Sequence, residues 1–310
     1  MSTLRDSVES YIALRRSLGF KLREPSRLLR HFVSFLEEQG ITHITTQLAL
    51  RWAQQPEVVQ PAYWAKRLGV VRQCAKHCSA TDPSTEVPPL GLLPHRYRRR
   101  APYLYTEDEI SRLIRAARQL PSVTGLRGWT YSTLLGLLAV SGIRSSEVLA
   151  LDRDAVNLSE GVLTILRTKF GKSRFVPLHS STIQALRNYA QRRNRLIQRP
   201  SSPAFFLSER GRRVNTDILH QTFNELSKQI GLHASDHRPR PRLHDFRHCF
   251  AVRTLLGWYR SGQDVERLMP LLSTYLGHTH VADTYWYISA APELLAYAGT
   301  RLERSVGRLP

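Results

Sequence analysis

The sequence is poor in acidic side chains, in cysteine and in long uncharged runs, and each shortage excludes a class of protein. Its 310 residues include 25 Asp and Glu against 45 Lys and Arg, so the formal net charge at pH 7 is +20. Three cysteines are too few for a disulfide framework, which excludes a small secreted scaffold. The longest run without a charged residue extends from Gly128 to Ile143, which is short for a membrane span and contains polar residues. We therefore interpret it as a buried helix and expect no membrane partner.

The remaining composition is that of a packed protein with a polyanionic partner. Hydrophobic residues make up 42% and charged residues 23% of the chain, which excludes disordered, collagen-like and coiled-coil proteins. A large excess of positive charge gives information about the binding partners of a protein and not about its fold. Most of the cations are arginines, whose forked donors suit phosphate. The charge therefore favours nucleic acid over an anionic membrane surface, with a basic chain that has no specific partner as the remaining alternative.

The cysteines and the N-terminus indicate a reducing compartment. Cys74, His77 and Cys78 have a loose zinc-like spacing, but no second half of a zinc site follows them, so we expect helix residues and no metal. The first residues, Met1 to Asp6, lack the apolar core of a secretion signal. We therefore expect a protein of a reducing compartment that is not secreted.

Hydrophobic spacing and a shift in composition divide the chain into three parts, in line with the two domains that its length favours. Apolar residues recur every three or four positions from Leu4 to about Ala80, which predicts a small all-helical domain over residues 1–82. Several prolines and a cluster of arginines predict a basic linker over residues 83–102. The third part, residues 103–310, is expected to be dominated by helices.

The third part begins with local signals that predict its first elements. Thr106 and Glu109 have the spacing of a capping box. The segment Trp129–Val140 is typical of a buried helix. Runs rich in β-formers at 162–166 and 174–178 flank a short polar segment, which predicts a hairpin. The expected fold is mainly α with a small β-sheet, in which an N-terminal helical bundle precedes an α+β domain.

Several residues of this part could carry chemistry, although each also has an ordinary structural interpretation. Arg144 follows a buried apolar helix, where an arginine must be paired or must face a ligand, and a surface pair with Glu147 would satisfy it. Lys169 lies near the tip of the predicted hairpin, where a solvated lysine is common. His244 and Arg247 are three residues apart and so share a helix face.

The last two candidates lie near the C-terminus. His278 directly follows a glycine that stops a helix, and alone it would be interpreted as a cap or core histidine. Tyr287 lies nine residues later in an aromatic stretch, where a core tyrosine is the ordinary interpretation.

Together and in this order, these pieces resemble the signature of the tyrosine recombinases, also called the phage integrase family. The matching text is SGIRSSEVLAL, TKFGKSRFVPL, RLHDFRHCFA and YLGHTHVADTYWY. The resemblance runs from about Tyr105 to Tyr287. It implies a DNA-binding core-binding domain over residues 1–82 and a catalytic domain over residues 103–310.

The resemblance also implies how the reaction proceeds. Tyr287 would attack a DNA phosphodiester, which forms a 3′-phosphotyrosine and frees a 5′-hydroxyl. Arg144 and Arg247 would hold the non-bridging oxygens with forked hydrogen bonds, and His278 would donate another. Glu147 would orient Arg144 from behind.

Proton transfer falls to two further residues of the matched set. His244 is placed for acid–base chemistry, and the family assigns protonation of the departing oxygen to the hairpin lysine, Lys169. No cofactor is expected, because the arginines replace the charge of a metal and the phosphotyrosine retains the bond energy. The lack of a P-loop or an acidic metal cluster agrees with this expectation.

Two assignments have close rivals in the sequence. Lys172 is three residues from Lys169, and alignment of the following strand favours Lys169. Tyr285 and Tyr287 flank Trp286, and the spacing of nine from His278 favours Tyr287 as the nucleophile. Tyr285 would then be a packing residue.

The resemblance and the charge together imply how DNA is held. Two basic domains with a basic linker could close around a duplex and contact its phosphates. In the family a C-terminal helix, here residues 292–304, packs into a neighbouring protomer. We expect double-stranded DNA with inverted-repeat core sites, bound in the nucleoid by a homotetramer or by a hetero-tetramer with related recombinases. The candidate DNA contacts are Arg96, Arg98, Arg99, Arg100, Lys172 and Arg174.

The expected function is site-specific DNA recombination, in a mobile-element integrase or transposase or in an Xer-like resolvase. A type IB topoisomerase would share the catalytic set but relax supercoils without a paired site. A catalytically inactive DNA-binding member of the family is the third alternative.

Overall fold

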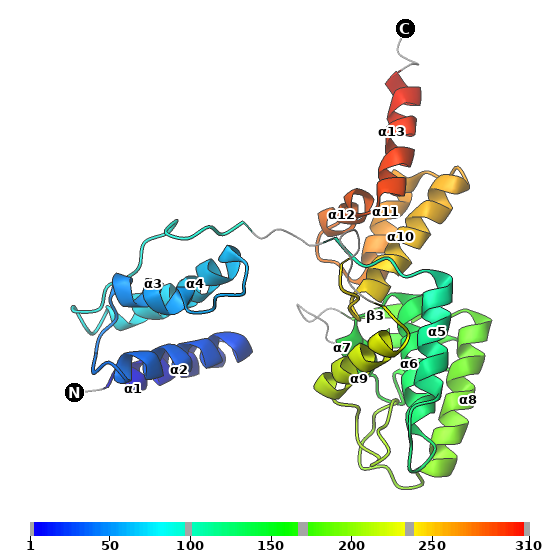
Figure 1. Ribbon diagram of the computed structural model, residues 1–310, viewed down its shortest axis with the longest axis horizontal. Helices are drawn as coiled ribbons and strands as arrows, with labels where there is room; N and C mark the ends of the chain where they lie inside the picture. The colour runs from blue at the N-terminus through cyan, green and yellow to red at the C-terminus, as the bar shows by residue number, and fades with distance from the viewer. Residues whose placement is uncertain (1–2, 97–100, 167–172, 233–238, 307–310) are drawn as a thin grey trace. The chain divides into compact units, whose positions relative to one another are not determined.

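A computed structural model describes residues 3–96, 101–166, 173–232 and 239–306 of the chain. The chain divides into two compact units, Met1–Arg99 and Arg100–Pro310 (Figure 1). Each unit has its own hydrophobic core, so each is described by itself.

The N-terminal unit contains a bundle of helices, as the apolar spacing predicts. Its helices are α1 (Leu4–Ser17), α2 (Arg23–Glu37), α3 (Thr46–Gln54) and α4 (Pro61–Cys78). Phe32 and Leu36 of α2 and Trp52 of α3 are completely buried and belong to one core cluster. Phe32 and Leu36 are about one helical turn apart, which places both on the inward face of α2.

The residues that follow α4 remain packed on this unit. The amide of Glu86 donates a hydrogen bond to the carbonyl of Ile44 at 2.8 Å. Arg72 of α4 donates to the carbonyls of Pro88 and Pro89 at 2.6 and 2.7 Å. Proline ends a helix, yet its carbonyl still accepts a hydrogen bond. The predicted linker therefore begins as a segment that covers the helical unit, while its bounds at 83 and 102 stay predictions.

The C-terminal unit begins with α5 (Glu107–Arg118) and α6 (Arg127–Ser141), and α8 (Ser180–Leu196) packs against α6 (Figure 1). The capping box of α5 is confirmed: the amide of Glu109 donates to the Thr106 hydroxyl at 3.1 Å, and the amide of Thr106 donates to the Glu109 carboxylate at 2.8 Å. The prediction that the apolar segment is a buried helix is also confirmed, because Leu134 and Leu138 of α6 are 0% and 1% exposed.

A small antiparallel sheet follows in the order β1 (Val156–Asn157), β2 (Val162–Ile165) and β3 (Arg174–Pro177). β2 and β3 form the predicted hairpin, in which buried Leu163 and Val176 are partners. β1 was not predicted, because two residues are too few to show alternation. The turn of the hairpin, with Lys169 and Lys172, lies outside the described residues.

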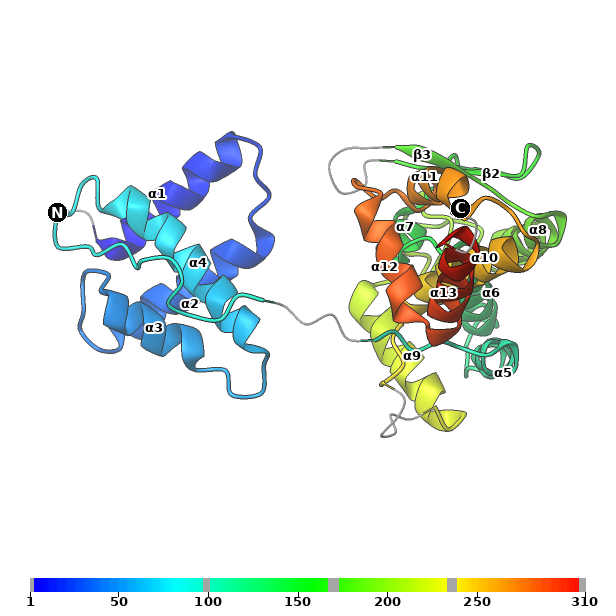
Figure 2. The same cartoon turned by 90° about the horizontal axis from the view of Figure 1, so that it is seen from above.

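The other helices of this unit carry the site. They are α7 (Ser145–Ala150), α9 (Thr216–Gln229), α10 (Asp245–Arg260), α11 (Val265–Leu276), α12 (Ala282–Ala290) and α13 (Pro292–Val306). Helices α10 to α13 gather around one core cluster that contains Leu255, Met269, Leu276 and Leu294 (Figure 2). Within the described parts of the chain, no helix has the length and apolar character needed to cross a membrane.

Candidate active site

Two glycines turn the chain at the places where candidate side chains follow. Gly142 (φ 60°) ends α6, and Arg144 is the N-cap residue of α7. Gly277 (φ 68°) ends α11, and His278 comes directly after it. Both glycines have left-handed backbones, which residues with a Cβ rarely adopt. His244 is the N-cap residue of α10, so the candidates occupy helix ends rather than helix centres.

Arg247, in the first turn of α10, ties two of these helix ends together. Its side chain is 2% exposed and donates to the carbonyls of Gly142 at 3.0 Å and Leu276 at 2.6 Å. Burial lowers the pKa of Arg247 to about 10, while its interactions with Tyr287 and Glu147 act in the opposite direction. The guanidinium therefore stays positive at neutral pH, and the ends of α6 and α11 are fixed around it.

Glu147 of α7 holds two arginines with one carboxylate. Arg144 donates to Oε1 at 2.8 Å, and Arg174 of β3 donates at 3.0 and 2.7 Å. Arg144 also donates to the carbonyl of Gly277 at 3.2 Å. The Arg144 side chain is 27% exposed and that of Arg174 only 8%. Arg144 is therefore the member of this group that a ligand can reach.

The charge of Glu147 is secured by its partners. Burial raises the pKa of Glu147, but hydrogen bonds from Arg174 and Arg144 outweigh burial and lower it to about 2. A carboxylate that is ionised throughout the neutral range holds Arg144 in one place, which favours binding of an anion there.

The two candidate histidines lie in a strongly positive environment. Removal from bulk water, together with the charges of Arg247 and Arg144, lowers the pKa of His244 and of His278 to about 4. His244 is an exposed residue, whereas His278 is half-buried. Nδ1 of His278 lies 2.7 Å from the hydroxyl of Thr284 in α12. Both imidazoles are thus neutral at neutral pH, and each can donate one hydrogen bond and accept another.

Tyr287 of α12 is buried inside this group of residues. Its side chain is 2% exposed, its ring stacks on His278 with centroids 6.0 Å apart, and it contacts His248 edge-on at 5.4 Å. Its phenol is close enough to the guanidinium of Arg247 to act on the pKa of that arginine, which it raises. The prediction that Tyr285 is the packing residue is wrong, because Tyr285 is 46% exposed. A helix turns by about 100° per residue, so only one of the two tyrosines can face the core.

Comparison with known proteins identifies the chain. Residues 104–293, more than half of its length, match the phage integrase family. The chain belongs to this family. It is a tyrosine-type site-specific recombinase, an enzyme of DNA strand breakage and rejoining.

Several relatives of this recombinase are similar over most of their length. A Sinorhizobium fredii protein named as an integrase/recombinase, y4rB, is 51% identical over 308 residues, which is 98% of each chain. The tyrosine recombinase XerD of Caulobacter vibrioides is 30% identical over 247 residues, 77% of this chain and 74% of that protein. The Tn1549 transposon integrase, solved with transposon right end DNA, aligns with a TM-score of 0.68 at 17% identity over 97% of this chain and 99% of that one.

The structure of this recombinase brings most of the predicted catalytic residues together. Those that lie in the group described above are Arg144, His244, Arg247, His278 and Tyr287. Lys169 lies outside the described residues, as do the DNA-contact candidates Arg98, Arg99, Arg100 and Lys172. Arg96 is exposed in the N-terminal unit.

Arg174 has a different environment from the one expected of a DNA contact. It is nearly buried, its forked end is occupied by Glu147, and its Nε donates to the carbonyl of Tyr275 at 2.7 Å. Arg174 therefore links the hairpin strand β3 both to Glu147, the carboxylate that also binds Arg144, and to the end of α11. This arrangement favours support of the site over contact with phosphate.

Other parts of the site were not found from sequence. The carbonyls of Gly142, Leu276 and Gly277 hold the arginines, and backbone acceptors have no signature in side-chain patterns. Thr284 contacts His278, and its position three residues before Tyr287 is a signal that could have found it, since residues three apart share a helix face. His248 of α10 has ring contacts with both His244 and Tyr287.

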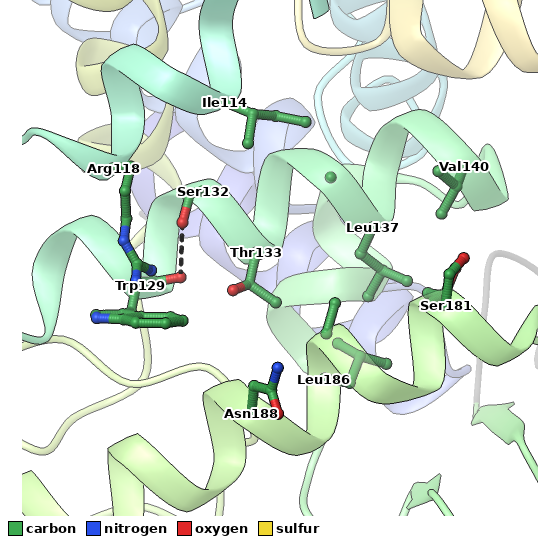
Figure 3. Close-up of a pocket in the computed structure, with 13 residues that line it drawn as sticks. Ile114, Arg118, Trp129, Ser132, Thr133, Leu137, Val140, Ser181, Leu186 and Asn188 are labelled. Carbon is green, nitrogen blue, oxygen red and sulfur yellow. Dashed lines mark hydrogen bonds between the residues drawn. The ribbon is translucent and has the colours of Figure 1, made fainter. Parts of the chain in front are cut away.

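A large pocket of this unit lies away from these residues. It has a volume of about 370 Å³ and lies between α5, α6 and α8 (Figure 3). Trp129 lines it, with the guanidinium groups of Arg118 and Arg192 over its ring. Its lining includes Leu137 and Val140 but no residue of the catalytic group. The pocket lacks a nucleophile with a neighbouring base, so it does not compete as the reaction centre.

Proposed function

We propose that this recombinase cuts DNA by attack of the Tyr287 hydroxyl on a phosphodiester. The new bond joins the phenolic oxygen to phosphorus as a 3′-phosphotyrosine, the bond from phosphorus to the 5′-oxygen breaks, and attack by the freed 5′-hydroxyl of a partner strand reverses the step. The observation that carries the proposal is the burial of Tyr287 with its ring stacked on His278, where its phenol interacts with the buried Arg247 guanidinium. This contact places the hydroxyl next to a fixed positive charge.

Two arginines supply the charge that phosphoryl transfer needs. Arg247 remains cationic, and the charge on Glu147 keeps Arg144 oriented. A guanidinium has five N–H donors, so Arg144 retains donors for phosphate oxygens after binding Glu147 and Gly277. Fixed donors need no reorganisation as negative charge develops, which is the main source of catalysis in such reactions.

Proton transfer is assigned to a neutral histidine and to the hairpin lysine. His244, neutral because its pKa is lowered to about 4, accepts the proton of Tyr287 as the new bond forms. Arg247 stabilises the negative charge that develops on the phenolic oxygen. His278 donates a hydrogen bond to a non-bridging oxygen. Lys169, by its place in the family motif, gives a proton to the departing 5′-oxygen.

We further propose that the substrate is double-stranded DNA with inverted-repeat core sites. Support comes from the net charge of +20 and from solved relatives, since XerH was solved with a palindromic difH substrate and lambda integrase as a tetramer on a Holliday junction. Residues 1–82 would act as the core-binding domain. The biological role would be that of a mobile-element integrase or transposase, or of an Xer-like resolvase, acting on the nucleoid in the cytoplasm.

The assembly on DNA is proposed to be a tetramer, of this chain alone or with related recombinases. Its support is α13, an amphipathic helix at the end of the chain. Leu294 at its start is completely buried, whereas the adjacent Leu295 is 50% exposed. An exposed apolar side chain beside a buried one suits a helix that packs on a second protomer as well as on its own.

The experiment that tests the chemistry uses a nicked suicide duplex made from the DNA that flanks the gene. Wild type, Tyr287→Phe and the matched control Tyr285→Phe are incubated with it in EDTA and separated on a denaturing gel. A slow covalent protein–DNA band for wild type and Tyr285→Phe, absent for Tyr287→Phe, is the expected result. A band lost only in Tyr285→Phe would overturn the assignment of the nucleophile. Relaxation of a supercoiled plasmid that lacks the site would favour a topoisomerase.

A further inference from the structure

A buried threonine of α12 directs its hydroxyl at the ring of His278 and not at a carbonyl of its own helix. Thr254 and Thr300 donate their hydroxyls to the carbonyls four residues earlier, at 2.9 and 3.1 Å. The side chain of Thr284 instead places its Oγ1 2.7 Å from Nδ1 of His278, and Thr284 is 0% exposed. The hydroxyl is thus directed out of its own helix and onto a residue of the site.

The burial of Thr284 determines which group donates. Among the described residues, the only hydrogen-bond partner of this hydroxyl is Nδ1 of His278. If Nδ1–H were the donor, the hydroxyl proton would be left without an acceptor in a place that water does not reach, and a buried donor without a partner is costly. The hydroxyl therefore donates, and Nδ1 accepts.

We propose that Thr284 is a positioning residue that fixes the proton of His278 on Nε2, the tautomer that can donate to a phosphoryl oxygen. This inference rests on the proposed function, in which His278 is such a donor. A neutral imidazole carries only one proton, so a ring with its proton on Nδ1 would present a lone pair to the anion and repel it. The carboxylate–histidine pairs of other enzymes use a second residue to set the tautomer in the same way.

The fixed tautomer matters because His278 stays neutral. The pKa of His278 is lowered to about 4 by burial and by the charges of Arg247 and Arg144. An imidazolium would donate from both nitrogens, so its tautomer would not matter. A neutral ring at pH 7 carries its proton on only one nitrogen, and a hydrogen-bond partner is needed to fix which one.

The same contact joins His278 to the helix of the nucleophile. Thr284 and Tyr287 are three residues apart on α12 and share a face, and Tyr287 also stacks on the ring of His278. The histidine therefore receives its tautomer only while α12 is packed in this position. Because Thr284 lies on the same helix as the nucleophile, Nε2 of His278 can donate to the phosphate only while Tyr287 is also in place.

The test compares Thr284→Val with Thr284→Ser, with the suicide duplex as substrate. Valine keeps the branched shape and removes the hydroxyl, whereas serine keeps the hydroxyl. Partners that fix a histidine in metal sites are worth about 10- to 100-fold in activity, so we expect Thr284→Val to slow covalent cleavage by about that factor, with binding to an intact duplex unchanged. Thr284→Ser should restore cleavage to within about threefold of wild type, by the same reasoning.

A double-mutant cycle separates positioning from a general structural defect. If Thr284 acts through His278, Thr284→Val should cause no further loss in a His278→Gln background, because the two changes remove one interaction. Nitrogen-15 spectra of histidine-labelled protein at neutral pH give a second readout. They should show Nδ1 of His278 without a proton in wild type and Thr284→Ser, and a mixture of tautomers in Thr284→Val.

Failure of this inference is distinguishable from failure of the proposed function. Wild-type cleavage that is lost in Tyr287→Phe but unchanged in Thr284→Val would overturn the inference and leave the function standing. An additive loss in the His278→Gln background, or a wild-type spectrum with the proton on Nδ1, would also overturn it. If wild type forms no covalent product on any duplex while Tyr287→Phe binds DNA equally well, the proposed function itself fails.

Discussion

At the scale of single residues, the buried carboxylate of Glu147 is the charge on which the arginines depend. It is 8% exposed and accepts hydrogen bonds from Arg144 and Arg174. We expect Glu147→Gln to lower the free energy of unfolding by about 3 kcal/mol, because it leaves two arginines without their counter-charge in a nearly buried site. Cleavage should slow as Arg144 loses its fixed position. Urea unfolding and the suicide-duplex assay measure the two effects.

The matched control for Glu147 lies in the same unit. Glu293 pairs with Arg260, and both side chains are more than half exposed. Glu293→Gln should leave stability nearly unchanged, because exposed ion pairs contribute little. Equal effects of the two substitutions would show that Glu147 is an ordinary surface partner.

A second residue-scale prediction concerns pH. The pKa of His278 is lowered from 6.5 to about 4 in the folded protein by burial and neighbouring arginines. Between about pH 6.5 and 4 the unfolded chain binds this proton and the folded protein does not, so this contribution to stability is complete above the window and falls as pH falls through it. In His278→Gln the loss of stability between pH 7 and pH 5 should be smaller by on the order of 1 kcal/mol.

Urea unfolding of each variant at both pH values measures that difference. If His278→Gln and wild type lose equal stability, His278 is not the neutral, half-buried group that the site requires.

The sequence predicts the charged residues of the site better than it predicts their surroundings. Arg144, Arg247 and Tyr287 could be selected because their types and order match a known chemistry. The carbonyls of Gly142 and Leu276 could not, because backbone acceptors are chosen by tertiary packing. Burial of Tyr287 in preference to Tyr285 likewise depends on which face of α12 meets the rest of the unit, and neighbouring aromatic residues give no periodicity that fixes it.

At the scale of elements, the end of α11 joins the histidine motif to the hairpin strand. A Cβ built on Gly277 would lie 2.8 Å from Nη1 of Arg174, and the backbone there has a φ of +68°. We expect Gly277→Ala to displace Arg174 from Glu147, to cost about 1–3 kcal/mol of stability through backbone strain, and to slow covalent cleavage at least about tenfold through the misplaced Arg144.

Gly262 separates backbone strain from the side-chain clash. Its φ is +69°, and nothing lies within 4 Å of the Cβ it would carry. Gly262→Ala should therefore show a cost of about 1 kcal/mol in urea unfolding and cleave the suicide duplex at the wild-type rate. A Gly277→Ala protein that cleaves as well as Gly262→Ala would refute the link between α11, Arg174 and the site.

Secondary-structure elements that depend on residues close in sequence could be predicted, whereas elements that depend on contacts between distant parts of the chain could not. The capping box at Thr106 and the β2–β3 hairpin follow from patterns within a few residues, and both are confirmed. β1 pairs over only two residues with β2, so it exists because of the sheet and leaves no pattern of its own. The segment after α4 was expected to be a linker because its contacts with the helical unit leave no pattern in the sequence. Its prolines exclude a helix, but they do not indicate that the Arg72 side chain donates hydrogen bonds to their carbonyls.

At the scale of the whole molecule, we expect the net positive charge to contribute more to DNA affinity than any single contact does. A net charge of +20 that comes mostly from arginine predicts that much of the affinity for DNA arises from release of counterions at phosphates. A protein with six to ten such contacts loses about 10³- to 10⁵-fold in affinity between 50 and 200 mM salt, and we expect this recombinase to lie in that range.

Tyr287→Phe is the variant with which to measure this, because it binds without being trapped covalently. Its affinity for the duplex flanking the gene and for a random duplex of equal length should fall with closely similar slopes against the logarithm of salt concentration, since both contain the same phosphates. The flanking duplex should bind more tightly at every salt concentration, because base contacts add to the shared electrostatic part. A shallow slope for both would mean that the excess positive charge faces away from DNA, and the proposal that DNA is the partner behind that charge would have to be withdrawn.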